Sequence, residues 1–205
     1  MPNLRSNLSR TYPEAGCDEA GRGCLAGPVF AAAVIFPKGY YNSRIRDSKI
    51  LKEHDRESLA ELIKQKALTF GVASCSPSEI DKWNILQCSI KAMHRAVKKL
   101  NIQPTHIIVD GNYFLPYQQV PHTTVVKGDD KYLSIAAASI LAKVARDHYM
   151  KRIDKKYPQY HWLSNKGYPT KAHRNAIAES GVTKYHRMSF QLLKDDSTVQ
   201  GKIEF

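Results

Sequence analysis

Four acidic positions form the most informative pattern in this sequence, because each stands where a predicted strand ends or a turn begins. Asp18 closes a first strand and is followed directly by Glu19. Asp110 closes the apolar segment HIIVD, and Asp129 follows a third strand. Acids at the carboxyl ends of neighbouring strands converge on one edge of an α/β sheet. Close carboxylates repel one another, so this arrangement predicts a bound cation, although each acid taken singly is equally well explained as a turn former or helix cap.

The chemistry expected of such a cluster is metal-dependent hydrolysis. Carboxylate oxygens favour Mg²⁺ or Mn²⁺, whereas zinc prefers nitrogen and sulfur ligands. Two ions about 3.5–4 Å apart stabilise the attacking and leaving oxygens of phosphodiester hydrolysis. The four cysteines are scattered without a C-x-x-C pair, so we expect buried side chains rather than ligands. The eight histidines stand singly, and we expect most of them at the surface or core edge rather than in a histidine-based ribonuclease site.

The charge balance indicates what the chain binds. Lysine and arginine total 31 against 19 aspartates and glutamates, which gives a formal net charge of +12 at pH 7. Such a surplus attracts polyanions, although a solvated cationic surface is the plainer explanation. An acidic cluster in a basic chain favours a nuclease, because cationic side chains would hold phosphates while the acids hold metal ions. The alternative is a non-catalytic RNA–DNA hybrid-binding protein, which would have no use for convergent acids.

Neighbouring residues of a regular strand point to opposite faces, so Asp18 and Glu19 cannot both face a metal from within one. We therefore expect Glu19 to lie past the end of its strand, where Gly21 and Gly23 permit a sharp turn. This makes Glu19 the less secure ligand of the pair.

The segment from Gly21 to Ala26 satisfies the dinucleotide pattern G-x-G-x-x-G/A, which leaves an NAD-dependent enzyme as a remote alternative. A cofactor loop must open directly into a helix, but Gly27-Pro28 and a strand-like run follow here. A backbone clamp is the better interpretation. Glycines let the main chain approach a sugar, its N–H and C=O groups can bond a 2′-hydroxyl, and Arg22 would contact phosphate. A tight turn with an exposed arginine is the plain alternative.

The elements that position these residues mingle strands and helices, which predicts an α/β layered domain. Strands are expected over residues 14–18, 29–36, 70–75, 106–110 and 123–127. Helices are expected over residues 55–68, 86–100, 135–157 and 170–180. The third helix is apolar nearly all round, as a central buried helix would be, and the last is capped by Thr170 and closed by Gly181.

The chain is interpreted as a single catalytic domain over residues 1–193, with a helical C-terminal part from about residue 158, followed by a flexible polar tail over residues 194–205. No stretch approaches the roughly 20 apolar residues of a membrane span, and the N-terminus lacks the apolar core of a signal peptide. A cytoplasmic protein is the default expectation.

Linked motifs run in order over roughly residues 14–190. They are Gly16-Cys17-Asp18-Glu19-Ala20-Gly21-Arg22-Gly23, Gly27-Pro28-Val29, Asp47-Ser48-Lys49, Glu79-Ile80-Asp81, Asn84-Ile85-Leu86, Val109-Asp110-Gly111-Asn112, Lys127-Gly128-Asp129, Ala137-Ala138-Ser139-Ile140-Leu141-Ala142-Lys143-Val144, Lys166-Gly167-Tyr168-Pro169-Thr170 and His186-Arg187-Met188-Ser189-Phe190. In these motifs the chain resembles the ribonuclease HII (type 2 ribonuclease H) family of bacteria, and so many together are more specific than any one.

The resemblance implies a ribonuclease H-like fold, with a mixed central β-sheet flanked by helices and a smaller helical C-terminal part. It implies an endoribonuclease that uses Mg²⁺ or Mn²⁺, with two ions when substrate is bound. The enzyme would cut on the 5′ side of a ribonucleotide in RNA–DNA hybrids and in duplex DNA with embedded ribonucleotides, leaving 3′-hydroxyl and 5′-phosphate ends. The sister family, ribonuclease HIII, lacks the Gly-Arg-Gly clamp and carries an extra N-terminal domain, so type HII is preferred.

The same resemblance assigns roles to individual residues. The family's four acids correspond to Asp18, Glu19, Asp110 and Asp129, the set already reached from strand ends, with the adjoining Asp130 as the alternative fourth ligand. The family's clamp corresponds to Gly21, Arg22 and Gly23. Its tyrosine that stacks on the deoxyribose after the RNA–DNA junction corresponds to Tyr168.

Further contacts are assigned less sharply. Phosphate contacts are suggested for Lys49, Lys127 and Lys143, each of which is just as well explained as a surface lysine. Arg146 and Asp147 are expected to form a local pair on a helix surface. The segment 191–193 (QLL) is slightly similar to a sliding-clamp peptide, although core packing explains it better. A monomer is expected.

Overall fold

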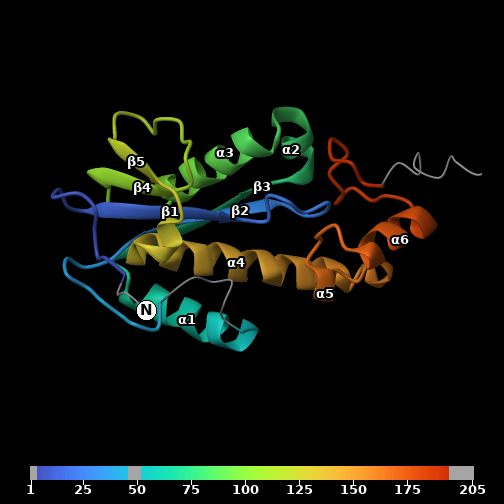
Figure 1. Cartoon of the computed structure of the whole chain (residues 1–205), viewed down its shortest axis with the longest axis horizontal. Helices are drawn as coiled ribbons and strands as arrows, with labels where there is room; N and C mark the ends of the chain where they lie inside the picture. Colours follow the sequence, from blue (N-terminus) through green and yellow to red (C-terminus); the bar gives the residue numbers. More distant parts are fainter. Residues whose placement is uncertain (1–3, 46–51, 194–205) are drawn as a thin grey trace, which may run out of the picture.

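The computed structural model describes residues 4–45 and 52–193, and its centre is a five-stranded mixed sheet. The strands are β1 (Glu14–Ala20), β2 (Val29–Ile35), β3 (Thr69–Cys75), β4 (His106–Asp110) and β5 (His122–Val125). Their order across the sheet is β3-β2-β1-β4-β5 (Figure 1). The β3-β2-β1 part is antiparallel, whereas β1, β4 and β5 run parallel to one another. The predicted fold class, a ribonuclease H-like mixed sheet flanked by helices, is confirmed.

Helices cover both faces of the sheet (Figure 1). Helix α3 (Ile85–Lys98) lies on one face, while α4 (Leu133–Asp154) crosses the other and carries α1 (Glu53–Lys66) on its outer side. Alternate residues of β2 enter two different cores: Ala31 belongs to the core beneath α3, and Ala32 to the core beneath α4. Small side chains on both faces of β2 let a helix approach from each side. The expectation that α4 is a central buried helix is confirmed.

The ends of several predicted elements differ from those observed. Strand β1 continues to Ala20, and β5 ends at Val125, so Lys127 lies beyond it in a left-handed conformation with a φ of 55°. The sequence prediction lacks the seven-residue helix α2 (Pro77–Trp83). Its signal was present, because the Ser76 side chain accepts from the backbone N–H of Glu79 in a capping box. Leu86, the first residue of the helix expected over residues 86–100, is exposed, and the observed helix α3 begins one residue earlier.

The chain after α4 is helical. It forms a 3₁₀ turn η2 (Pro158–Tyr160), the short helix α5 (Trp162–Asn165) and helix α6 (Lys171–Ser180), at the right of Figure 1. Helix α6 begins and ends as predicted, with the Thr170 hydroxyl accepting from the His173 N–H and Gly181 following its last residue. Buried rings of Tyr160 and Trp162 form the core of this part.

Two general features concern the cysteines and the length of the helices. The cysteines are free and buried, as predicted. Within residues 4–45 and 52–193, no helix combines the length and the apolar character required to cross a membrane. The proposed tail at residues 194–205 and the motif that contains Lys49 lie outside the described residues.

Close contact between β1 and α4 yields a test of the packing. A Cβ atom added to Gly16 would overlap the backbone of Ser134 and Ile135 in the first turn of α4. We expect Gly16→Ala to push the helix from the sheet and to destabilise the protein by about 1–3 kcal/mol, measured by urea unfolding. Gly23→Ala is the matched control, because an added Cβ there meets nothing within 4 Å. Equal unfolding midpoints for the two variants would contradict this packing.

Candidate active site

The parallel strands bring the predicted acids to one edge of the sheet. Asp18 and Glu19 lie near the carboxyl end of β1, and Asp110 is the last residue of β4. Asp129 lies in the 3₁₀ turn η1 (Gly128–Asp130), which follows β5. The N–H of Gly128 donates to Oδ1 of Asp110 at 2.7 Å and so joins the η1 turn to the end of β4.

Glu19 lies inside β1, so the expectation that it falls past the strand's end is wrong. The parallel pairing of β1 with β4 stops at Cys17, and from Asp18 onward β1 pairs only with β2. That edge of β1 is therefore open toward Asp110. The Asp18 carboxylate turns back along its own strand and accepts from the Glu19 N–H at 2.6 Å. Although neighbouring side chains of a strand point to opposite faces, the charge of Asp110 raises the pKa of both Asp18 and Glu19.

The electrostatics of Asp18 show how close these carboxylates lie. Burial raises the pKa of Asp18 well above its ordinary value, and the charges of Glu19 and Asp110 raise it further. Hydrogen bonds from the Ser139 hydroxyl and the Glu19 N–H act in the opposite direction. Burial also raises the pKa of Glu19, against the lowering effect of Arg22, while the charge of Asp110 adds to the rise. A buried group of like charges is stabilised by a cation.

The donor set fits a hard divalent cation, because these residues offer carboxylate oxygens and no nitrogen or sulfur. Among residues 4–45 and 52–193, however, no three His, Cys, Asp or Glu side chains are already grouped to hold an ion. The acids are therefore neighbours that repel one another rather than a closed ligand cage. Asp129 is buried whereas the adjoining Asp130 is exposed, which favours Asp129 as the member of this group.

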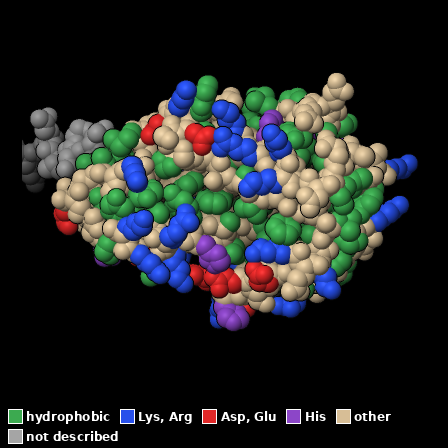
Figure 2. Space-filling model, turned by 180° about the vertical axis from the view of Figure 1, so that it is seen from behind, with side chains coloured by type: hydrophobic (Ala, Val, Ile, Leu, Met, Phe, Trp, Pro, Cys, Tyr) green, Lys and Arg blue, Asp and Glu red, His purple; other side chains and the backbone are tan. Residues whose placement is uncertain are grey.

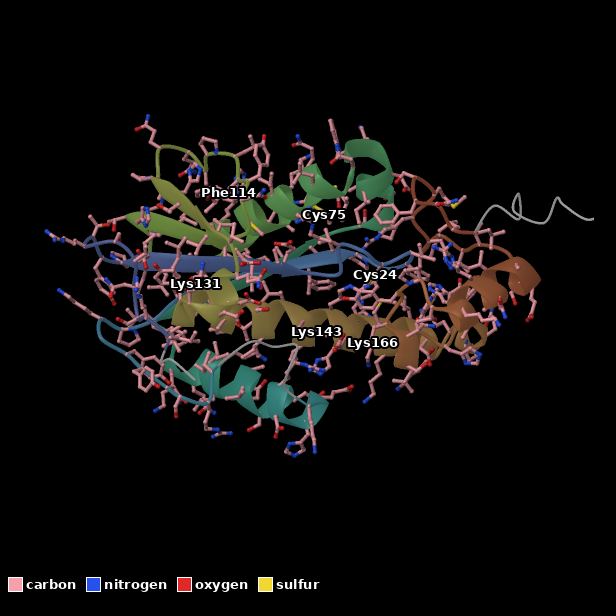
Figure 3. The ribbon with its side chains drawn as sticks, viewed as in Figure 1. Cys24, Cys75, Phe114, Lys131, Lys143 and Lys166 are labelled. Atoms are coloured by element: carbon pink, nitrogen blue, oxygen red, sulfur yellow. The ribbon has the colours of Figure 1, made fainter. Side chains whose placement is uncertain are left out.

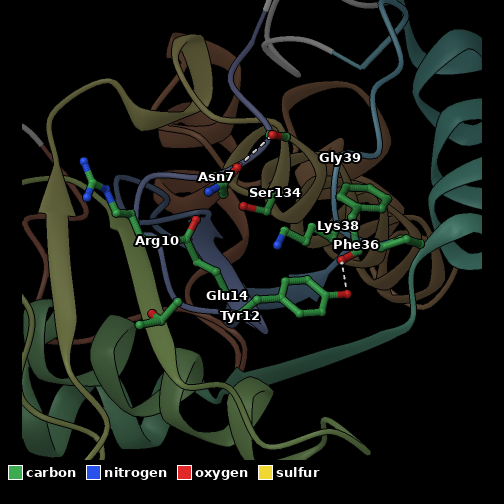
Figure 4. Close-up of a pocket in the computed structure, with 11 residues that line it drawn as sticks. Asn7, Arg10, Tyr12, Glu14, Phe36, Lys38, Gly39 and Ser134 are labelled. Atoms are coloured by element: carbon green, nitrogen blue, oxygen red, sulfur yellow. Dashed lines mark hydrogen bonds between the residues drawn. The ribbon is translucent and has the colours of Figure 1, made fainter.

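A pocket elsewhere in the molecule lies at the opposite end of β1 (Figure 4). Glu14, the first residue of that strand, lines it together with Lys38 and Ser134. The Glu14 carboxylate already accepts from the N–H groups of Leu8 at 2.8 Å and Ser9 at 2.7 Å. This pocket is therefore separate from the edge that carries the four acids.

The glycine segment leads from β1 into β2, so no helix N-terminus receives a pyrophosphate and the NAD alternative is wrong. Gly21 has a φ of 94°, and an added Cβ there would overlap the Arg146 guanidinium. Arg22 extends from the turn, with its side chain 51% exposed and its Nη1 3.4 Å from Oε1 of Glu19. The clamp therefore begins directly beside the acidic residues.

Two buried arginines hold this segment from behind. Arg187 donates to the carbonyls of Gly21 (2.7 Å), Arg22 (2.7 Å) and Gly27 (3.0 Å). Because those carbonyls face the protein, the clamp turns its other side outward. Among the described residues, no hydrogen bond uses the N–H groups of Arg22, Gly23 or Cys24. Of these three residues, Arg22 and Gly23 are exposed and Cys24 is buried, so the exposed amide donors of this turn are those of Arg22 and Gly23.

The expectation that Arg146 and Asp147 form a local surface pair is wrong. Arg146 is fully buried and donates to the carbonyls of Pro28 (3.2 Å), Ala26 (3.1 Å) and Lys166 (2.8 Å). Two of these carbonyls lie in the connection between β1 and β2 and the third follows α5, and no sequence pattern reveals them. Asp147 is also buried.

Tyr168 lies beside the clamp. The N–H of Leu25 donates to the carbonyl of Gly167 at 2.8 Å, and the Tyr168 hydroxyl and Cys24 thiol form a hydrogen bond. The Arg146 guanidinium lies 5.9 Å from the centre of the Tyr168 ring, which is 42% exposed. One arginine therefore joins the glycine segment to the turn that carries the tyrosine.

The predicted lysines lie in different environments. Lys127 is exposed next to η1, whereas Lys143 on α4 donates to Oδ1 of Asp147 at 2.6 Å (Figure 3). Lys166, absent from the predicted set, lies near the same helix and forms an ion pair with Glu53 at 3.5 Å (Figure 3). The expectation that most histidines lie at the surface or core edge is confirmed, with His173 and His186 as the buried exceptions at 0% and 2% exposure.

Comparisons with known proteins show which sequences and structures this chain is similar to. The family model described as Ribonuclease HII matches residues 15–193. The Ribonuclease HII of Phocaeicola vulgatus is 58% identical over 193 residues, which cover 94% of this chain and 96% of that protein. The ribonuclease H2 from Pyrococcus horikoshii OT3 has a TM-score of 0.73 at 25% identity, over 87% of this chain and 94% of the other. A chain of the PCNA:RNase HII complex from Archaeoglobus fulgidus has a TM-score of 0.70 at 28% identity, over 88% and 96%.

Repulsion among the acids predicts that Asp18→Asn stabilises the metal-free protein. A carboxyl whose pKa is raised by folding costs stability as pH rises above its unfolded value, and the amide removes that cost while still accepting from Glu19. We expect a gain of about 1 kcal/mol near neutral pH, measured by urea unfolding in chelator. This gain in stability should shrink as the pH is lowered toward the ordinary pKa of an aspartate.

The same samples test the cation. Added Mg²⁺ or Mn²⁺ should raise the unfolding midpoint of the wild type and have a much smaller effect on Asp18→Asn. Equal midpoints without metal, together with equal responses to metal, would show that Asp18 neither repels its neighbours nor binds a cation.

Proposed function

Because this chain belongs to the ribonuclease HII family, and is therefore a metal-dependent type 2 ribonuclease H, we propose that Asp18, Glu19, Asp110 and Asp129 are its metal ligands. The observation that carries the assignment is the mutual interaction of Asp18, Glu19 and Asp110 at the carboxyl edge of the sheet. Buried like charges are a poor arrangement for stability alone and a suitable one for binding Mg²⁺ or Mn²⁺.

The proposed reaction is hydrolysis of the phosphodiester bond on the 5′ side of a ribonucleotide, with 3′-hydroxyl and 5′-phosphate products. Bound divalent ions, two when substrate is present, would supply Lewis acidity at the attacking and leaving oxygens. The residues of the chain orient the carboxylates that would hold these ions. Asp18 is held by Ser139 and by the Glu19 N–H, and Asp110 by the Gly128 N–H, so these carboxylates are oriented before substrate arrives.

The clamp and Tyr168 are proposed to read the substrate. The N–H groups of the exposed Arg22 and Gly23 lie opposite the carbonyls that Arg187 holds in the same peptides, so they are available to the ribose 2′-hydroxyl and its phosphate. The exposed guanidinium of Arg22 adds a charge-assisted phosphate contact. The half-exposed Tyr168 ring next to the clamp would stack on the neighbouring deoxyribose.

The cationic surface supports binding of duplexes. Lysine and arginine side chains are spread over the face in Figure 2, with smaller groups of acidic side chains between them. We propose RNA–DNA hybrids and ribonucleotide-containing duplex DNA as substrates, and replication and repair in the cytoplasm as the setting. Phosphate contacts by Lys127 and Lys143, and by Lys49 outside the described residues, belong to this proposal.

A sliding-clamp contact is the remaining partner proposal, and the relative from Archaeoglobus fulgidus is found in a complex with PCNA. In this chain Arg174 donates to the carbonyls of Gln191 and Leu192, while the Leu193 side chain is 46% exposed. Leu192 packs against the C-terminal core, so only part of the segment 191–193 is available to a partner.

Cleavage of a DNA duplex with one embedded ribonucleotide tests the proposed chemistry. With Mg²⁺ we expect incision 5′ to that ribonucleotide, and we expect Asp110→Asn to lower the rate at least about a hundredfold while binding is retained. Asp130→Asn is the matched control and should keep most of the activity. Full activity of Asp110→Asn would show that Asp110 is not part of the mechanism. Loss of activity in Asp130→Asn alone would show that Asp130, rather than Asp129, is the fourth metal ligand.

Substrate reading by Tyr168 is tested by a ratio of rates. We expect Tyr168→Ala to lower kcat/KM on the single-ribonucleotide duplex about tenfold more than on a long RNA–DNA hybrid, because stacking at the junction is lost. Tyr168→Phe keeps the ring and should retain the wild-type ratio. Arg22→Ala should also weaken the junction preference. If both substrates lose activity equally in Tyr168→Ala and Arg22→Ala, the proposed reading roles are wrong.

A further inference from the structure

Two hydrogen bonds fix the ring of His173, which is fully buried near the start of α6. Its Nε2 lies 2.9 Å from Nε1 of Trp162, and its Nδ1 lies 3.0 Å from the carbonyl oxygen of Tyr168. An indole N–H only donates, so Nε2 must accept. A carbonyl only accepts, so Nδ1 must carry the proton. One neutral tautomer satisfies both bonds, and neither the other tautomer nor the charged ring does.

The carbonyl that His173 holds belongs to the turn that presents Tyr168. Within this turn the Tyr168 N–H donates to the carbonyl of Asn165 at 2.9 Å, and the Thr170 N–H donates to the Tyr168 carbonyl at 2.8 Å. These bonds are local and hold the turn only to itself. The bond from His173 connects the same carbonyl, through one ring, to the fully buried indole of Trp162.

We propose that His173 is a positioning residue for substrate reading, which in its Nδ1–H tautomer fixes the Tyr168 main chain and so aims the tyrosine ring at the substrate. The inference rests on the proposed reading role of Tyr168. His173 itself cannot touch a bound duplex, since none of its surface is exposed. It acts by linking the main chain of the exposed Tyr168 to the buried indole of Trp162.

The surroundings of His173 favour the neutral ring. The rings of His186, Trp162 and Tyr160 lie 5.5, 6.2 and 6.3 Å away between centroids. Burial among these groups lowers the pKa of His173, against the raising effect of its hydrogen bonds to the carbonyls of Tyr168 and Gly167, and the nearby charge of Arg174 lowers it further. Burial thus favours the same neutral ring that the bonds to Trp162 and Tyr168 require.

The neighbouring His186 provides an internal comparison. Its Nδ1 lies 2.9 Å from the N–H of Thr183, a donor, so Nδ1 accepts and Nε2 carries the proton. Two buried histidine rings in contact are thus expected to hold opposite tautomers. Only the His173 tautomer places an N–H toward the Tyr168 carbonyl.

Long-range ¹H–¹⁵N correlation spectra of protein labelled with [¹⁵N]histidine test the tautomer without any activity measurement. We expect the Nδ1–H pattern for His173 and the Nε2–H pattern for His186, with signals assigned by the loss of peaks in His173→Asn and His186→Asn. The Nε2–H pattern or a charged ring at His173 near neutral pH would overturn the proposal.

A kinetic comparison tests the positioning role. His173→Phe keeps a buried ring and removes both hydrogen bonds, so we expect its preference for a single-ribonucleotide duplex over a long hybrid to fall about tenfold. His173→Asn keeps a donor near the Nδ1 position and should restore most of the preference. The control Tyr160→Phe removes the bond from a buried hydroxyl to the carbonyl of Gly181 in the same core, which does not lead to Tyr168.

The outcomes separate the two proposals. The positioning role would be overturned if His173→Phe and Tyr160→Phe lost the preference for the single-ribonucleotide duplex equally, or if His173→Asn did not restore it. Either result would show that His173 contributes only to the stability of the core. If Tyr168→Ala leaves the preference unchanged, the proposed reader has failed, and an altered preference in His173→Phe would then contradict the path through Tyr168. The unfolding midpoint of every variant is measured beside its rates.

Discussion

Repulsion between carboxylates at the ends of β1 and β4 is the constraint around which the rest of this structure is arranged. Asp18 is buried close enough to Glu19 and Asp110 for both charges to raise its pKa. Such a cluster opposes folding unless a cation joins it, so the stability needed to form it must come from elsewhere. It comes from the two cores beneath α3 and α4, in which the alternating small residues of β2 let both helices pack closely. The sheet is therefore a rigid support that holds unfavourable charges in place.

The side of the molecule that is proposed to read the substrate faces the opposite problem, because there the buried charges are cations. Arg146 and Arg187 have no surface exposure, and their donors are used on main-chain carbonyls rather than on carboxylates. Burial lowers the pKa of Arg187 to about 10, which reflects the cost of removing a guanidinium from water. A guanidinium has five donors in a fixed plane, so one side chain can hold several turns of irregular backbone. A clamp made of glycines gains its shape in this way without losing its outward N–H groups.

The sequence predicted the strands and the acids at their ends because these depend on local patterns. Segments ending in Asp18 or Asp110 indicate strands with acids at their carboxyl ends, whereas the mixed sheet was implied by the resemblance to a family. The position of Glu19 was mispredicted because the end of a strand depends on its neighbours: β4 stops pairing with β1 at Val109, whereas β2 continues to pair with β1 as far as Ala20. Arg146 was misplaced for a related reason, since its partners are carbonyls of a distant turn, and carbonyls have no sequence signature. Patterns predict which side chains are apolar, but not which backbone groups remain to be satisfied.

Helix α4 links the two halves of the site. Ser139 bonds the Asp18 carboxylate, and Arg146, seven positions later, bonds the turns that carry the clamp and Tyr168. Seven residues of α-helix span two turns and about 10.5 Å, so both residues lie on the same face at a fixed spacing. That spacing is set by the regular geometry of the helix rather than by loops. The distance between the proposed substrate clamp and the proposed metal ligands is therefore set by one buried helix, and it stays constant only while Gly16 lets that helix remain against β1.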